Sequence, residues 1–123
     1  MNVYEYWDAS LRQDADRMRG FFRADAFVNW HNTNERFSVD EFIQANCEYP
    51  GAWSGNVERV ETLGSLLITV THVYAAERQP SFHVTSFFML VENRIASLDE
   101  YWGDDGPAPQ WRADMRLGRP IKP

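Results

Sequence analysis

SFHVTSFFMLVENRIASLDEYW, residues 81–102, alternates apolar and polar side chains with a period of two on both sides of a short polar turn. The turn is Glu92-Asn-Arg94, and the flanking segments, 81–91 and 94–102, are long enough to form strands. A connection this short makes two consecutive strands antiparallel. The stretch therefore predicts a β-hairpin.

Two further strands are predicted upstream, over residues 56–63 and 66–77, where the same period holds. Leu63-Gly-Ser65 separates them, and a turn at Glu77-Arg-Gln-Pro80 leads into the hairpin. The four strands together indicate an antiparallel meander. A shorter strand is predicted over residues 26–31.

The N-terminal part of the chain has the period of a helix. One amphipathic stripe contains Tyr4, Trp7, Leu11, Ala15, Met18 and Phe22, and Gly20 loosens or ends this helix. A second helix is predicted over 39–48, because Ser38-Val-Asp-Glu41 fits a capping box. Helices followed by a meander predict an α+β fold with helices on one face of a curved sheet. Residues 1–123 have the length of one domain.

Composition limits the partners and the location. The net charge of −6 opposes attraction to nucleic-acid phosphates and to anionic membranes. Cys47 is the single cysteine, and the most apolar stretch, Leu66 to Val70, is far too short to cross a bilayer. We expect a cytoplasmic protein that binds neither nucleic acid nor membrane.

Four stretches carry a family resemblance: Trp30-His-Asn-Thr-Asn-Glu-Arg-Phe-Ser38, Ala45-Asn-Cys-Glu-Tyr-Pro-Gly51, Phe82-His-Val-Thr-Ser-Phe-Phe88, and Glu100-Tyr-Trp102 followed by Pro107-Ala-Pro-Gln-Trp-Arg112. Over nearly its whole length the chain resembles the nuclear transport factor 2-like superfamily, in particular its small SnoaL-like proteins. The resemblance implies a cone-shaped half-barrel whose helices and sheet enclose a cavity. Members include ketosteroid isomerases, scytalone dehydratase, limonene epoxide hydrolase, polyketide cyclases and non-catalytic binding domains. The fold alone therefore does not identify a reaction.

The same resemblance excludes one mechanism. It places Trp30 where ketosteroid isomerases carry their aspartate base, and Ser86 where they carry a protonated acid. Both carboxyl groups are missing here, so steroid isomerisation by that mechanism is not expected. The similar Tyr-Trp pair in the last strand implies that Trp102 lines the cavity, and alternation then places Leu98 and Glu100 beside it.

Glu100 and His72 are the predicted catalytic residues. Partial desolvation between Leu98 and Trp102 would raise the pKa of Glu100 into the range useful for acid–base chemistry. His72 lies on the more apolar face of the strand 66–77, which we expect to point inward, where it could exchange protons with Glu100. Two alternatives stay open: Glu100 as a rim residue paired with an arginine such as Arg59, and His72 as a core histidine.

The predicted ligand-binding residues are Trp30, Tyr74, Val84, Ser86, Phe88, Leu98 and Trp102. No cofactor motif is recognisable, and no metal site is expected, because the assigned faces put His72 and His83 on opposite sides of the sheet. His83, Phe87 and Met89 are assigned to the outer face, where an apolar surface predicts a homodimer. Trp111 is expected to pack against the domain.

Two classes of function follow from these residues. The first is a cofactor-free lyase, isomerase, cyclase or hydrolase that acts on a small apolar or aromatic molecule. The second is a non-catalytic dimeric module that binds a ligand or partner in the same cavity. A deep cavity that contains Glu100 favours the enzyme, whereas a cavity filled by its own aromatic side chains favours the module.

Overall fold

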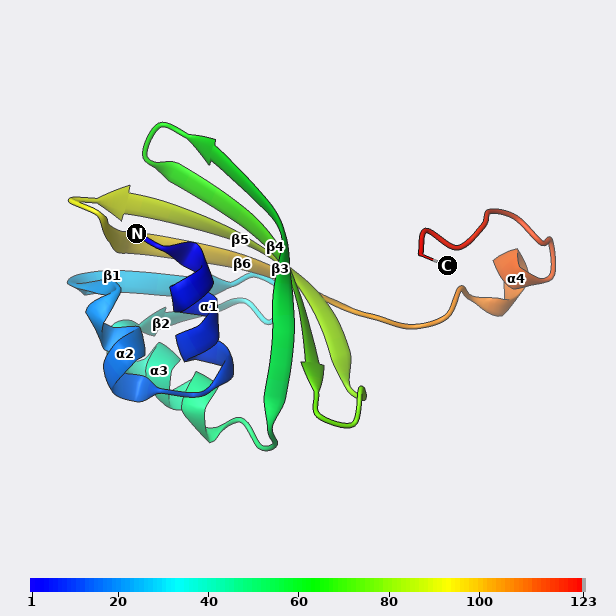
Figure 1. Ribbon diagram of the computed structural model, residues 1–123, viewed down its shortest axis with the longest axis horizontal. Coiled ribbons are helices and arrows are strands. Elements are labelled where there is room, and N and C mark those ends of the chain that lie inside the picture. The colour runs from blue at the N-terminus through cyan, green and yellow to red at the C-terminus, as the bar shows by residue number, and fades with distance from the viewer. Residues whose placement is uncertain (123) are drawn as a thin grey trace.

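A six-stranded curved sheet forms the body of the protein, in the order β2-β1-β6-β5-β4-β3 (Figure 1). This computed structural model describes residues 1–122. The strands are β1 (Phe22–Trp30), β2 (Glu35–Ser38), β3 (Trp53–Leu63), β4 (Leu66–Ala75), β5 (Ser81–Val91) and β6 (Arg94–Asp104). All neighbours are antiparallel except β1 and β6, which are parallel. The predicted α+β class and the meander are confirmed.

Three helices lie on one side of this sheet (Figure 1): α1 (Val3–Leu11), α2 (Ala15–Gly20) and α3 (Val39–Glu48). The predicted capping box of α3 is present, with Ser38 and Glu41 each accepting a hydrogen bond from the other's backbone N–H. Within residues 1–122, no helix combines the length and the apolar character that a bilayer span requires.

The N-terminal helix differs from its prediction. It is broken into α1 and α2 between residues 12 and 14, where Gln13 adopts a positive φ of 56° and Asp14 caps α2. The predicted stripe is wrong at both ends: Tyr4 is 63% exposed, whereas Tyr6 is fully buried, and Phe22 begins β1 instead of continuing the helix. The Tyr6 ring packs edge-on against Phe88 of β5, with ring centroids 5.1 Å apart.

The predicted face of β4 is also wrong. The residues that point toward the helices are Leu67, Thr69, Thr71 and Val73, all of them buried. The more apolar set, which includes Ile68, Val70 and Tyr74, lies on the outer face. Thr69 accepts a hydrogen bond from the indole N–H of Trp7 at 3.2 Å. The buried face of β4 therefore carries the polar threonines, and the more apolar face, which was predicted to point inward, lies outside.

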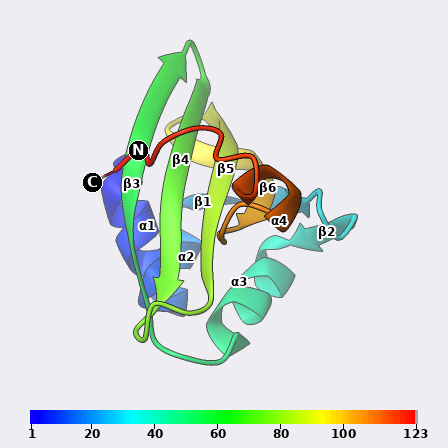
Figure 2. The ribbon, with the colours of Figure 1, turned by 90° about the vertical axis from the view of Figure 1, so that its right-hand side faces the viewer.

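The C-terminal segment, residues 105–122, leaves the sheet on the side opposite to α1–α3 (Figures 1 and 2). It contains one short helix, α4 (Gln110–Ala113), and its apolar side chains are exposed. Trp111 is 62% exposed, so the expectation that it packs against the domain is wrong.

We predict that Gly55→Ala destabilises the protein. A Cβ at Gly55 would lie 2.3 Å from the carbonyl oxygen of His72 in β4, so the two strands would have to separate. We expect a loss of roughly 1–3 kcal/mol in the free energy of unfolding, measured by urea denaturation. Gly20→Ala is the control, because a Cβ there meets no atom within 4 Å. Equal stability of the two variants would contradict this account.

Candidate functional site

A cavity of about 650 Å³ lies between the helices and the inner face of the sheet. Its aromatic lining consists of Trp7, Trp30, Phe42, Tyr49, Trp53, Phe82 and Trp102. Its polar lining includes Ser10, Gln13, Asn32, Asn46, Glu100 and Asp104. A mainly apolar cavity of this size with few polar groups has the usual character of a small-molecule site.

The aromatic side chains form a continuous series along the cavity wall. Trp30 contacts Trp102 with ring centroids 6.4 Å apart, and Trp102 contacts Phe82 at 5.9 Å. Phe82 contacts Trp53 at 6.1 Å, and Trp53 contacts Tyr49 at 5.1 Å. Because each ring supports the next, the wall keeps its shape and leaves the cavity open instead of filling it.

Glu100 lies at the centre of the sheet, on β6. Strand register places it beside Trp30 of β1 and beside Ser86 of β5. The indole N–H of Trp30 donates to Oε1 at 3.1 Å, and the hydroxyl of Ser86 donates to Oε2 at 2.7 Å. The side chain is 1% exposed and forms part of the cavity wall.

Burial controls the acidity of Glu100. Desolvation raises its pKa to about 7, although the hydrogen bonds from Ser86 and Trp30 favour the ionised form. The alternative of a rim glutamate paired with Arg59 is wrong, because Arg59 lies 3.0 Å from Glu61 on β3. Glu100 can therefore exist in either protonation state near neutral pH, as a general acid or base requires.

Two buried polar groups near this site have no partner within residues 1–122: the Tyr6 hydroxyl and the Trp102 indole N–H. Burial, and then the charge of Glu100, raise the pKa of Tyr6 well above its ordinary value. Tyr6 therefore stays protonated. Trp102 lines the cavity, but its indole N–H is itself buried.

The structure divides the predicted site residues among three places. Glu100, Trp30 and Trp102 lie in the cavity wall. Val84, Ser86, Phe88 and Leu98 point inward but are buried behind that wall, where Ser86 acts through its bond to Glu100. His72 and Tyr74 lie on the outer face, so their predicted place in the cavity is wrong. A Glu100–His72 pair does not form.

The prediction also missed part of the wall. Trp53 and Tyr49 flank the Pro50-Gly51 turn, where neither helical nor strand alternation assigns a face. The helical period predicts that Trp7 packs against the core, and the structure shows that it also borders the cavity. Tyr49 lies within a stretch that carries the family resemblance, which was the one available signal.

We predict that Glu100 makes the stability depend on pH. Its folded pKa of about 7 exceeds the ordinary value of 4.5, so its contribution is fully present below pH 4.5 and is lost as pH rises through 7. Relative to Glu100→Gln, wild type should lose roughly 3 kcal/mol of unfolding free energy over this interval. Urea denaturation of both proteins from pH 4 to 8 measures the difference. Parallel pH profiles would refute the raised pKa.

Comparison with known proteins gives structural neighbours only. No family model and no curated protein matches the sequence. A provisionally assigned ketosteroid isomerase from Kribbella flavida matches with a TM-score of 0.80 and 17% identity, covering 98% of this chain and 88% of that one. A nuclear transport factor 2-like protein of unknown function from Burkholderia xenovorans matches with a TM-score of 0.79 and 20% identity, covering 98% and 92%.

A third neighbour has a bound ligand. It is a hypothetical protein with a ketosteroid isomerase-like fold from Catenulispora acidiphila, crystallised in complex with trimethylamine. It matches with a TM-score of 0.66 and 10% identity, and the match covers 80% of this chain and 82% of that one. The sheet order, the helices on one face and these neighbours together show that the chain has the nuclear transport factor 2-like fold, as the sequence resemblance implied.

Proposed function

We propose that the protein binds a small apolar or aromatic molecule in its cavity and acts on it as a cofactor-free lyase, isomerase, cyclase or hydrolase. The observation that carries this proposal is Glu100, a buried carboxyl group in the wall of an apolar cavity with a pKa of about 7. Perturbed acids in cavities are characteristic of catalytic sites.

The hydrogen bonds of Glu100 suit it to proton transfer. Trp30 and Ser86 each hold one carboxylate oxygen, so the group keeps its orientation while its proton comes and goes. The ionised form takes a proton from a bound molecule, and the protonated form returns it at another atom. With His72 on the outer face, Glu100 performs both steps itself.

A non-catalytic binding module is the second candidate, and the composition of the cavity wall favours it. Aromatic rings around a carboxylate are suited to an organic cation, because both the ring faces and the anion attract positive charge. The Catenulispora acidiphila neighbour in complex with trimethylamine supports this ligand chemistry. In this case the positive ligand binds to the ionised form of Glu100, and no proton is transferred.

The two candidates make different predictions for Glu100→Gln. We would screen aromatic ketones, epoxides and hydroxylated compounds for turnover, and tetramethylammonium and trimethylamine for binding by calorimetry. An enzyme should lose at least a hundredfold in kcat while keeping its affinity for a neutral substrate. A cation-binding module should show no turnover and should lose at least tenfold in affinity for tetramethylammonium.

The control is Glu61→Gln, which removes an exposed carboxylate paired with Arg59 on β3. It should preserve both properties. Undiminished turnover in Glu100→Gln would defeat the enzyme proposal, and undiminished affinity for tetramethylammonium would defeat the module.

We also propose that the protein is a homodimer through the outer face of the sheet. Phe87, Met89, Ile68 and Val70 lie on that face, where each is half-buried or exposed. The C-terminal segment adds exposed apolar side chains on the same side: Trp111, Met115, Leu117 and Ile121. Apolar surface of this extent is typical of an interface.

Phe87→Glu should dissociate the dimer, because it places a charge in the apolar interface. We expect light scattering to give twice the chain mass of 14.4 kDa for wild type and the single mass for the variant. Tyr4→Glu, an equally radical change at an exposed position of α1, should stay dimeric. A monomeric wild type at 100 micromolar would contradict the proposal.

A further inference from the structure

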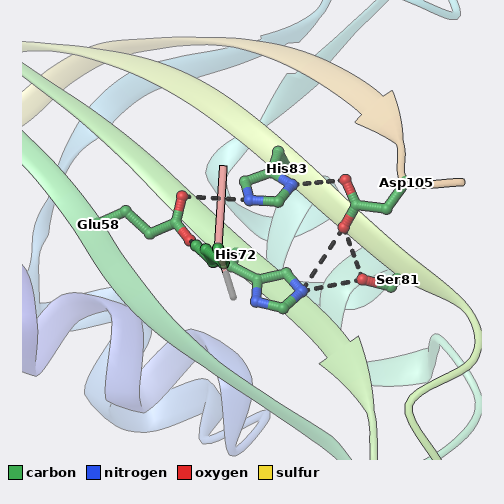
Figure 3. A network of polar contacts seen from close by, with 6 residues as sticks. Glu58, His72, Ser81, His83 and Asp105 are labelled. Carbon is green, nitrogen blue, oxygen red and sulfur yellow. Dashed lines mark hydrogen bonds and ion pairs between the residues drawn. The ribbon is translucent and has the colours of Figure 1, made fainter. Parts of the chain in front are cut away.

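Figure 3 shows a cluster of histidine and carboxylate side chains around His72 and His83. These two histidines lie on the outer face of the sheet, because the residues that alternate with them in β4 and β5 are the ones that point toward the helices. His72 of β4 and His83 of β5 are direct register partners, with stacked rings whose centroids are 4.8 Å apart. An irregularity in β3 between Val57 and Arg59 places Glu58 beside them. Asp105 approaches from the end of β6.

The potential ligand atoms converge. Nε2 of His83 lies 3.1 Å from Oε1 of Glu58. One ring nitrogen of His72, one of His83 and one oxygen of Glu58 all lie within 4.8 Å of one another. Around a tetrahedral zinc ion, ligand atoms at about 2.1 Å from the metal are roughly 3.4 Å apart. The Glu58–His83 pair already has this spacing, and the His72 nitrogen, within 4.8 Å of both atoms, has to move closer by no more than about 1.5 Å.

We propose that Glu58, His72 and His83 form a binding site for a divalent transition-metal ion, with Zn²⁺ as the best match. Two imidazoles and one carboxylate are ligands that suit zinc, and three protein ligands leave a fourth position open. The histidine side chains are 24% and 40% exposed, so an ion can enter from solvent.

The surrounding groups support the site. Asp105 bonds to Nδ1 of His83, which fixes the ring so that Nε2 faces Glu58, as outer-shell carboxylates do for metal-bound histidines. Ser81 bonds to Nε2 of His72 at 2.9 Å and donates to Asp105 at 2.6 Å. Lys122 contacts Oε2 of Glu58 at 3.0 Å, which leaves Oε1 for the ion.

The test is titration of the untagged, chelator-treated protein with Zn²⁺ by calorimetry. We expect one equivalent to bind. His72→Gln and His83→Gln should each weaken binding at least tenfold, and Asp105→Asn by about 10- to 100-fold through loss of outer-shell support. His31→Gln is the matched control, because His31 is another half-exposed histidine paired with a carboxylate, Asp99, at 2.7 Å. Its affinity should equal that of wild type.

A second measurement does not depend on the variants. In wild type, long-range ¹H–¹⁵N spectra should show Zn²⁺ shifting the ring nitrogens of His72 and His83 and leaving those of His31 unchanged. The proposal is overturned if no saturable binding occurs, if both glutamine variants bind like wild type, or if His31 alone responds.

Discussion

The register of β6 between β1 and β5 is the constraint on which the inner site depends. It sets Glu100 directly beside Trp30 on one side and Ser86 on the other, so each carboxylate oxygen meets one donor. A slip of one residue would turn Glu100 to the outer face and bring Tyr101 in. The two hydrogen bonds offset part of the cost of burying the carboxyl group, and the remaining cost appears as its raised pKa.

The sheet separates two kinds of chemistry. Its inner face holds Glu100 buried among aromatic rings, where desolvation raises the pKa of the carboxyl group, and the exposed Asp104 also borders the cavity. Its outer face holds His72, His83, Glu58 and Asp105, half-exposed and mutually hydrogen-bonded. The same strands supply both, since alternate residues of one strand point to opposite faces. Thr71 and Val73 face inward on either side of His72, which faces out.

Much of the fold could be predicted from local pattern. The capping box at Ser38 set the start of α3, and short polar turns set the antiparallel order of β3 to β6. Which face of β4 points inward could not be predicted. The two polar residues Thr69 and Thr71 are buried in the interior, whereas the apolar residues Ile68 and Val70 lie on the outer face. Hydrophobicity alone therefore assigned His72 to the wrong side. The same error hid the pairing of His72 with His83.

The sequence by itself determined the class of fold, because alternation is a local property. The inward position of Trp102, and with it Glu100, followed from the family resemblance, as did the comparison of residues 30 and 86 with the carboxyl groups of ketosteroid isomerases. Only the tertiary structure decided which groups meet. The parallel pairing of β1 with β6 joins residues 70 positions apart at Trp30 and Glu100. The outer cluster likewise needs β3, β4, β5 and the end of β6 together. Such contacts depend on strand order and register across the whole sheet, which no local pattern encodes.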